Sequence, residues 1–287
     1  MISYSFQSVE EATFPPMIHL VVTNACNIKC VHCAYTFISE ERGFRPVHLD
    51  WNLFTRVVDE VTQHPHSILR FTCDGEPLMN PRLVEMVAHA KDRGISPVTI
   101  NTNGILLKRG VAEGLLKAGI DVVEVSINAF SRERYADLRQ VDNYDKVLAN
   151  LFYLLGARDR GGYKTKVMVS IIDQEPVREE LGPFVDYWTP LVDKVIVRRY
   201  TSYRGIVPGP EEEEPKEERW PCFVLWRRFT INSLGQGRFC FNDWYNKSVM
   251  WDLNGGATIR EIWQSQEYQE LRRLHLAGEF HKIPYCA

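Results

Sequence analysis

The 287-residue sequence contains no apolar run approaching the roughly 18–20 residues that a membrane-spanning helix needs. Its beginning, MISYSFQSVEEATFPP, is acidic and lacks the apolar core of a secretion signal. The chain has 34 Lys and Arg and 37 Asp and Glu, so basic residues are not in excess. No overall positive field therefore attracts nucleic acid. These absences predict a cytoplasmic protein whose partners include neither a membrane nor nucleic acid.

Cysteine is scarce, and its odd count of seven fits a framework of paired disulfides poorly. In a reducing compartment, closely spaced cysteines favour metal or redox chemistry. Cys26, Cys30 and Cys33 form the pattern C-x3-C-x2-C. The fourth cysteine that a closed metal site would need is missing from this stretch. Three thiolates on a [4Fe–4S] cluster leave one iron open to a small molecule. A small zinc site and three buried cysteines are the alternatives.

Apolar β-rich segments alternate with amphipathic helical patterns over the first 200 residues. Such segments are typical of parallel strands buried on both faces. We expect strands at 17–22, 68–73, 98–101, 122–128, 167–172 and 195–200, and helices at 51–63, 81–94, 145–157 and 175–188. Six β/α units predict an open barrel or a doubly wound sheet, and both place the active site at the carboxyl ends of the strands.

The C-x3-C-x2-C motif, directly after the first strand of a β/α chain, resembles that of the radical S-adenosylmethionine (SAM) superfamily. In that family the open iron chelates the amino and carboxylate groups of SAM. Reductive cleavage of SAM then gives a 5′-deoxyadenosyl radical, which abstracts a substrate hydrogen. The resemblance implies a partial (β/α)6 barrel, a SAM-ligating [4Fe–4S] cluster on the three cysteines, and a flavodoxin- or ferredoxin-type electron donor.

Further motifs follow in the order that the resemblance implies. CDGEPLMN, after the second strand, resembles the Gly-Gly-Glu-Pro stretch that contacts the SAM amino group, with Asp74 in place of the first glycine. INTNG and VSINAF end the next two strands and resemble stretches that contact SAM. Arg139 resembles the arginine that pairs with the SAM carboxylate, a task that suits a planar guanidinium. The implied SAM-binding residues are Asp74, Gly75, Glu76, Pro77, Asn101, Asn103, Ser126, Asn128 and Arg139.

After residue 204 the character of the sequence changes. Residues 205–221, GIVPGPEEEEPKEERWP, predict an exposed linker between a core of residues 1–204 and a small α+β domain of residues 222–287. We expect short strands at FTIN and GRFCF and one helix over TIREIWQSQEYQELRRLHLAG. This segment resembles the Twitch or SPASM auxiliary-cluster domains of the superfamily.

The resemblance implies a second iron–sulfur cluster on Cys222, Cys240 and Cys286. The sequence ends one residue after Cys286, so we expect the site to be incomplete, open or truncated. A fourth ligand would be Cys73, another side chain or the substrate. The alternative is three core cysteines without a cluster.

Small relatives with a Twitch domain resemble enzymes that oxidise or epimerise aminocyclitols and sugars in antibiotic pathways, whose substrates are polar and often cationic. We therefore expect dehydrogenation or epimerisation of such a molecule, with Cys73 as the candidate hydrogen-atom donor of an epimerase. Peptide maturation to a crosslink, thioether or D-residue is the second hypothesis, disfavoured because only about 16 residues precede the first strand. A non-catalytic zinc protein is the alternative of another class. The expected substrate-facing residues are Tyr35, Arg198, Tyr200, Asn242 and Asp243.

Overall fold

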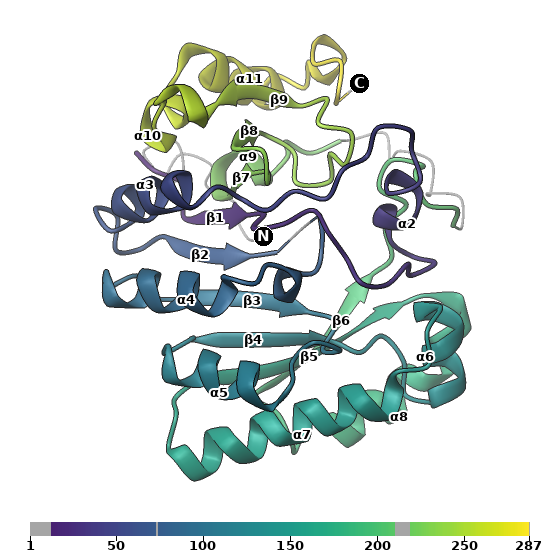
Figure 1. The fold of residues 1–287 in the computed structure, drawn as a ribbon. Helices are drawn as coiled ribbons and strands as arrows, with labels where there is room; N and C mark the ends of the chain where they lie inside the picture. Colours follow the sequence, from purple (N-terminus) through teal and green to yellow (C-terminus); the bar gives the residue numbers. More distant parts are fainter. Residues whose placement is uncertain (1–12, 73, 210–218, 287) are drawn as a thin grey trace, which may run out of the picture.

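The computed structural model describes residues 13–72, 74–209 and 219–286. Across these residues one continuous sheet runs in the order β6-β5-β4-β3-β2-β1-β7-β8-β9 (Figure 1). The first six strands are β1 (Met17–Leu20), β2 (Ile68–Phe71), β3 (Val98–Thr102), β4 (Val122–Ser126), β5 (Lys166–Asp173) and β6 (Lys194–Arg199). Neighbours among them are parallel and the sheet does not close, so the expected partial barrel is confirmed.

Helices connect these strands, and α3, α4, α5 and α7 run along one face of the sheet (Figure 1). Their bounds are α2 (Ala34–Ile38), α3 (Trp51–Val61), α4 (Leu83–Asp92), α5 (Arg109–Lys117), α6 (Arg132–Arg139), α7 (Tyr144–Gly161) and α8 (Leu181–Trp188), with 3-10 turns η1 (Pro77–Met79) and η2 (Glu175–Glu180). Helix α5 was not predicted, although its buried Ala112, Leu115 and Leu116 have helical spacing. Among the described residues, no helix is long and apolar enough to cross a membrane.

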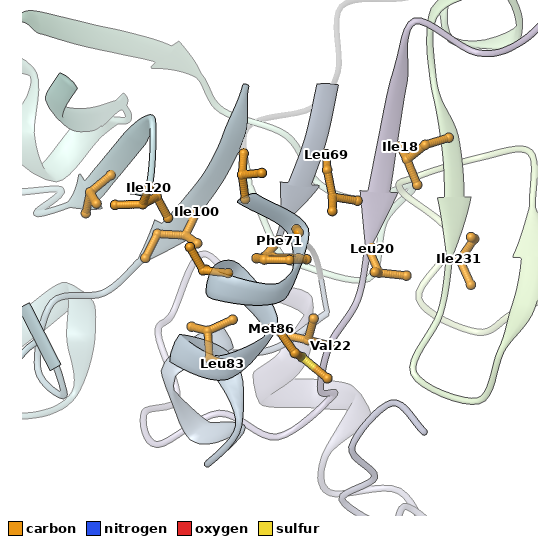
Figure 2. Packing of buried hydrophobic residues seen from close by; sticks show 14 of the residues in the cluster. Ile18, Leu20, Val22, Leu69, Phe71, Leu83, Met86, Ile100, Ile120 and Ile231 are labelled. Atoms are coloured by element: carbon orange, nitrogen blue, oxygen red, sulfur yellow. The ribbon is translucent and has the colours of Figure 1, made fainter. Parts of the chain in front are cut away.

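The parallel strands alternate between an apolar and a polar face. Ile18, Leu20, Leu69 and Phe71 are fully buried, and Figure 2 shows Phe71 close to Leu83 and Met86 of α4. Complete burial of each such side chain contributes about 1.5–3 kcal/mol. The residues that alternate with the apolar ones are polar (His19, Arg70, Asn101 and Glu124), and His19 and Glu124 are buried too. The central strands are therefore largely buried on both faces, as predicted, but only one face is apolar. In a strand, successive side chains point to opposite faces, and these polar residues lie opposite the helix-covered core.

The C-terminal segment extends the same sheet. β7 (Phe229–Ile231) pairs in parallel with β1, and β8 (Gln236–Arg238) and β9 (Val249–Asp252) continue it in antiparallel pairs. The remaining elements are α9 (Val224–Arg227), η3 (Leu253–Gly255), α10 (Ile259–Trp263), α11 (Gln266–Leu276) and η4 (Phe280–Lys282). The expectation of one long helix was wrong: Ser265 caps a second helix by accepting from the Tyr268 N–H at 3.2 Å. β9 was not predicted.

Buried polar contacts join this segment to the core. Arg238 on β8 is fully buried, and its Nη2 lies 2.5 Å from the Asp74 carboxylate after β2. Glu60 on α3 accepts from the N–H groups of Ile259 and Arg260 at 2.8 and 2.7 Å. These contacts, together with the β1–β7 pairing, pack the C-terminal segment against the barrel.

The buried Asp74–Arg238 pair predicts a large stability effect. Asp74→Asn should lower the free energy of unfolding by about 3 kcal/mol, because it leaves the buried Arg238 charge without its carboxylate. Glu40→Gln is the matched control, since the Lys29–Glu40 pair is exposed and its loss should cost at most about 1 kcal/mol. Denaturant titration of both variants measures the difference. Equal, small shifts would show that the buried pair does not tie the two segments together.

Candidate active site

The three cysteines lie in the loop that follows β1, at the carboxyl end of the strand. The loop is held from several sides: Cys30 O accepts from the Thr36 hydroxyl at 2.7 Å, and Cys26 O accepts from the Tyr35 hydroxyl at 3.2 Å. The Val31 N–H donates to Leu138 O at 3.0 Å, which connects the loop to α6. The loop therefore has a defined conformation that presents its thiols to the open end of the barrel.

The backbone of Gly75 lies directly against this loop. A Cβ at Gly75 would stand 2.4 Å from Ala25 O and 2.7 Å from Thr23 O. The next residue continues the contact, because the Glu76 N–H donates to Ala25 O at 2.8 Å. Only glycine permits so close an approach of two backbones.

A cavity of about 210 Å³ opens beside the loop and gathers the residues that the motifs predicted. Residues from the ends of β1 to β5 and from α6 contribute to its wall. Its lining includes Cys26, Cys30, Cys33, Gly75, Glu76, Asn101, Asn103, Ser126, Asn128 and Arg139. The structure thus brings together all of the expected SAM-binding residues except Asp74 and Pro77.

Glu76 is buried in this wall and fixes the neighbouring strand end. Its carboxylate accepts from the Thr102 hydroxyl at 2.6 Å, the Asn103 N–H at 2.7 Å and the Leu78 N–H at 3.1 Å. Burial raises the pKa of Glu76 above its ordinary value, although these three hydrogen bonds oppose the shift. Such a carboxylate can offer localised negative charge to a cationic ligand group.

Arg139 is buried in the wall of the same cavity and points at the cysteine loop. Its Nη1 lies 3.2 Å from Cys30 Sγ, and its other nitrogens donate to the carbonyls of Ser126 and Ile127. Burial raises the pKa of Cys26 to about 12 and raises that of Cys33 as well, with Arg139 opposing both shifts. A metal cluster would have to displace the protons of these thiols.

The donor set of this loop fits an iron–sulfur cluster. Within the described ranges, no three His, Cys, Asp or Glu side chains are placed to hold a single metal ion. A zinc ion would need its thiolates to converge to about 2.3 Å from one point. Thiolates that share a cluster need not converge in this way, because each can bind a different iron. Three thiols spread along one cavity wall therefore match a cluster better than a zinc ion.

A second cavity, of about 550 Å³, adjoins the first. The two share His32, Thr72, Asn101, Ile172, Arg198 and Tyr203. Of the expected substrate-facing residues, Arg198, Tyr200 and Asn242 line it. His19, Arg70 and Arg228 also line it and were not predicted. The signal was present for two of them, because His19 and Arg70 interrupt otherwise apolar strand segments.

Three other expected site residues have structural roles in this fold. Asp74 pairs with Arg238, the Asp243 carboxylate accepts from the Ser248 N–H at 2.5 Å in the interior, and the Tyr35 hydroxyl supports the cysteine loop. Asp74 and Tyr35 line a separate small cavity, and Pro77 begins η1. None of these four residues lines the two cavities described above, and their assignment to SAM or substrate stays a prediction. Cys73 lies outside the described residues.

The remaining cysteines lie near one another in the C-terminal segment. Cys222 is exposed, while Cys240 and Cys286 are half-buried. Burial, together with the nearby Cys222 and Cys286, raises the pKa of Cys240 to about 11. This set of three neighbouring thiols fits an auxiliary cluster with one ligand still to be supplied.

Comparison with known proteins agrees with this geometry. A model of the radical SAM superfamily matches residues 20–178, and a model of the SPASM iron–sulfur cluster-binding domain matches residues 222–287. The GTP 3′,8-cyclase of Chlorobaculum tepidum is 32% identical over 139 residues, 48% of this chain and 40% of that protein. The tungsten-containing aldehyde ferredoxin oxidoreductase cofactor-modifying protein of Pyrococcus furiosus is 31% identical over 112 residues, 39% of this chain and 30% of that protein. The matched region thus spans well under half of these relatives.

Solved structures resemble the chain over almost its whole length. BtrN in complex with AdoMet and 2-DOIA aligns with a TM-score of 0.61 and 19% identity, over 95% of this chain and 91% of that one. Streptococcus suis SuiB bound to the precursor peptide SuiA aligns with a TM-score of 0.73 and 14% identity, over 93% and 69%. Identities this low establish the fold alone.

The close approach at Gly75 predicts that an added methyl group disrupts the site. Gly75→Ala should lower the free energy of unfolding by about 1–3 kcal/mol, because the backbone of the cysteine loop must move. The same variant should retain less iron after anaerobic reconstitution. Gly110→Ala on α5 is the control, since nothing lies within 4 Å of its added Cβ. Melting curves and iron assays test both; unaltered iron binding in Gly75→Ala would contradict the close contact.

Proposed function

Because this chain belongs to the radical SAM superfamily, we propose that it is an enzyme that removes a carbon-bound hydrogen from a small polar, sugar-like substrate. The family and its SPASM domain imply a SAM-ligating [4Fe–4S] cluster, SAM and an auxiliary iron–sulfur cluster as cofactors. When bound, SAM and its cluster supply the 5′-deoxyadenosyl radical that abstracts the hydrogen. The division into a core, a linker at 205–221 and an auxiliary domain stays a proposal, as do a flavodoxin- or ferredoxin-type electron donor and a cytoplasmic location.

In this proposal Cys26, Cys30 and Cys33 hold the catalytic cluster. Glu76, fixed by its three donors, offers its charge to the SAM amino group. Arg139 lines the same cavity, and its guanidinium has donors beyond those that the Ser126 and Ile127 carbonyls accept. Those donors are proposed to bind the SAM carboxylate, while Asn101, Asn103, Ser126 and Asn128 contact the rest of the molecule.

The observation that carries the proposal is the adjacency of the two cavities. The 550 Å³ cavity and the smaller cavity beside the cysteines share six wall residues, so molecules bound in them would lie next to each other. A volume of 550 Å³ lies in the range of about 300–1,000 Å³ that is usual for small-molecule sites. A polar lining with aromatic residues, among them Tyr200, Phe241 and Trp244, suits a hydroxylated ring.

Dehydrogenation is the outcome that the auxiliary cysteines favour. Cys240 directly precedes Phe241 and Asn242, which line the larger cavity. A cluster on Cys240 would therefore lie next to the substrate, where it could accept the second electron of an oxidation. Epimerisation stays a second hypothesis, because its candidate hydrogen donor, Cys73, lies outside the described residues.

Two other substrate classes have some support. The structural likeness to SuiB, whose structure contains a precursor peptide, favours peptide maturation as an alternative. The likeness to the GTP 3′,8-cyclase covers 48% of the chain. A match of this extent says more about the shared SAM chemistry than about the substrate.

A non-catalytic zinc protein has the least support, since no three side chains of the described part are placed to share one ion.

Anaerobic reconstitution with iron and sulfide tests the proposal. The wild-type protein should bind iron and sulfide in equal amounts and, with reductant and SAM, release 5′-deoxyadenosine measurable by chromatography. Cys30→Ala should abolish that release, because the catalytic cluster loses a ligand. Cys222→Ala is the matched variant: it should lose the iron of one cluster and still cleave SAM. Zinc alone in the purified protein, or full SAM cleavage by Cys30→Ala, would end the proposal.

A further inference from the structure

A fully buried tyrosine, Tyr135 on α6, lies near the cysteine loop. Within the part of the chain that the structure describes, its hydroxyl group makes no hydrogen bond. An unpaired polar group in the interior costs free energy, so most buried hydroxyl groups have a partner. The neighbouring Tyr144 follows this rule, because its hydroxyl donates to Phe130 O. The Tyr135 hydroxyl therefore requires an acceptor that the loop does not provide while its cysteines are thiols.

Helix α6 brings Tyr135 and Arg139 to the same side of the cysteine loop. The two residues are one turn apart on one face of the helix, and Arg139 Cζ lies 5.9 Å from the centre of the Tyr135 ring. Arg139 Nη1 in turn lies 3.2 Å from Cys30 Sγ. The hydrogen bond from the Val31 N–H to Leu138 O, at 3.0 Å, holds the loop against the end of this helix. Tyr135, Arg139 and Cys30 therefore form one buried group.

The electrostatics of this group agree with its geometry. Burial raises the pKa of Tyr135 to about 12, Arg139 opposes the shift, and Cys30 adds to it. The hydroxyl is therefore protonated at pH 7 and able to donate. Cys30 is buried as well, so a thiolate at this position would hold negative charge in the interior and would need hydrogen-bond donors. A neutral thiol is only a weak acceptor, which explains why the hydroxyl has no partner when Cys30 is protonated.

We propose that the Tyr135 hydroxyl donates a hydrogen bond to the Cys30 thiolate when Cys30 is a ligand of the catalytic cluster. This inference rests on the proposed function, since it needs Cys30 in that role. Tyr135 and Arg139 then stabilise the same thiolate. Hydrogen bonds to the sulfurs of an iron–sulfur cluster raise its reduction potential, because the reduced form carries one more negative charge. Tyr135 is thus a positioning residue that acts through Cys30 and makes reduction by the electron donor easier.

Tyr135→Phe removes the hydroxyl and keeps the ring, so it tests this hydrogen bond directly. Wild-type and variant proteins are reconstituted anaerobically, their iron is counted, and a redox titration is followed by electron paramagnetic resonance. The signal that changes when SAM is added identifies the catalytic cluster. At one fixed potential, the ratio of reduced to oxidised cluster should be about five-fold lower in Tyr135→Phe, a shift of about 40 mV to lower potential. Equal potentials in the two proteins would overturn the inference.

Tyr144→Phe is the matched control, because the Tyr144 ring lies 5.5 Å from that of Tyr135 and its hydroxyl already has an acceptor. It should leave the potential unchanged, and a shift as large as that of Tyr135→Phe would assign the effect to packing and refute the hydrogen bond.

A second test keeps the hydroxyl, in case Tyr135→Phe does not hold its cluster. Incorporation of 3-fluorotyrosine at position 135 makes the proton more acidic, so the hydrogen bond should strengthen and the potential should rise. An unchanged or lower potential would contradict the inference. A wild-type protein that forms no cluster sensitive to SAM would instead contradict the proposed function, which separates the two failures.

Discussion

The backbone at Gly75 lies so close to the cysteine loop that no side chain fits between them. This contact sets the distance between the carboxyl ends of β1 and β2, where the three thiols and Glu76 must face one cavity. The Glu76 N–H holds the loop through Ala25 O, and the Glu76 side chain holds the end of β3 through Thr102 and Asn103. A single turn therefore aligns three neighbouring strand ends around the site.

Asp74, the residue before Gly75, connects this turn to the C-terminal segment. Asp74 replaces a glycine of the family motif, and its carboxylate pairs with the fully buried Arg238 of β8. Because β7 also pairs with β1, the auxiliary segment and the barrel share one sheet as well as this ion pair. Cys240 follows Arg238 by two residues, so the position of the Cys240 thiol depends on the turn that shapes the cavity beside the cysteine loop.

Features that depend on residues close together in the sequence could be predicted. Features that depend on contacts between distant residues could not. The six parallel strands and the cysteine motif follow from apolar segments and short spacings. Asp74 was assigned to SAM from its place in the family motif, whereas its ion pair with Arg238, 164 residues away, could not be predicted because nothing local identifies it. The break between α10 and α11 depends on the Ser265 cap, a weak signal inside a strong helical pattern. The polar faces of the strands were missed because His19, Arg70 and Glu124 are single exceptions in apolar segments.

In these strands, the residues that stabilise the fold differ from the residues that face the cavity. Leu69, Ile100 and Val123 are fully buried in the apolar core, while Arg70, Asn101 and Glu124 alternate with them and form the network at the cavity. Since adjacent residues of a strand point to opposite faces, a change at a cavity position leaves the apolar packing intact. The network is also mutually constrained, because Glu124 is buried and its loss would leave Arg70 and Arg198 without their shared carboxylate. A change in this polar network would therefore require Arg70, Glu124 and Arg198 to change together.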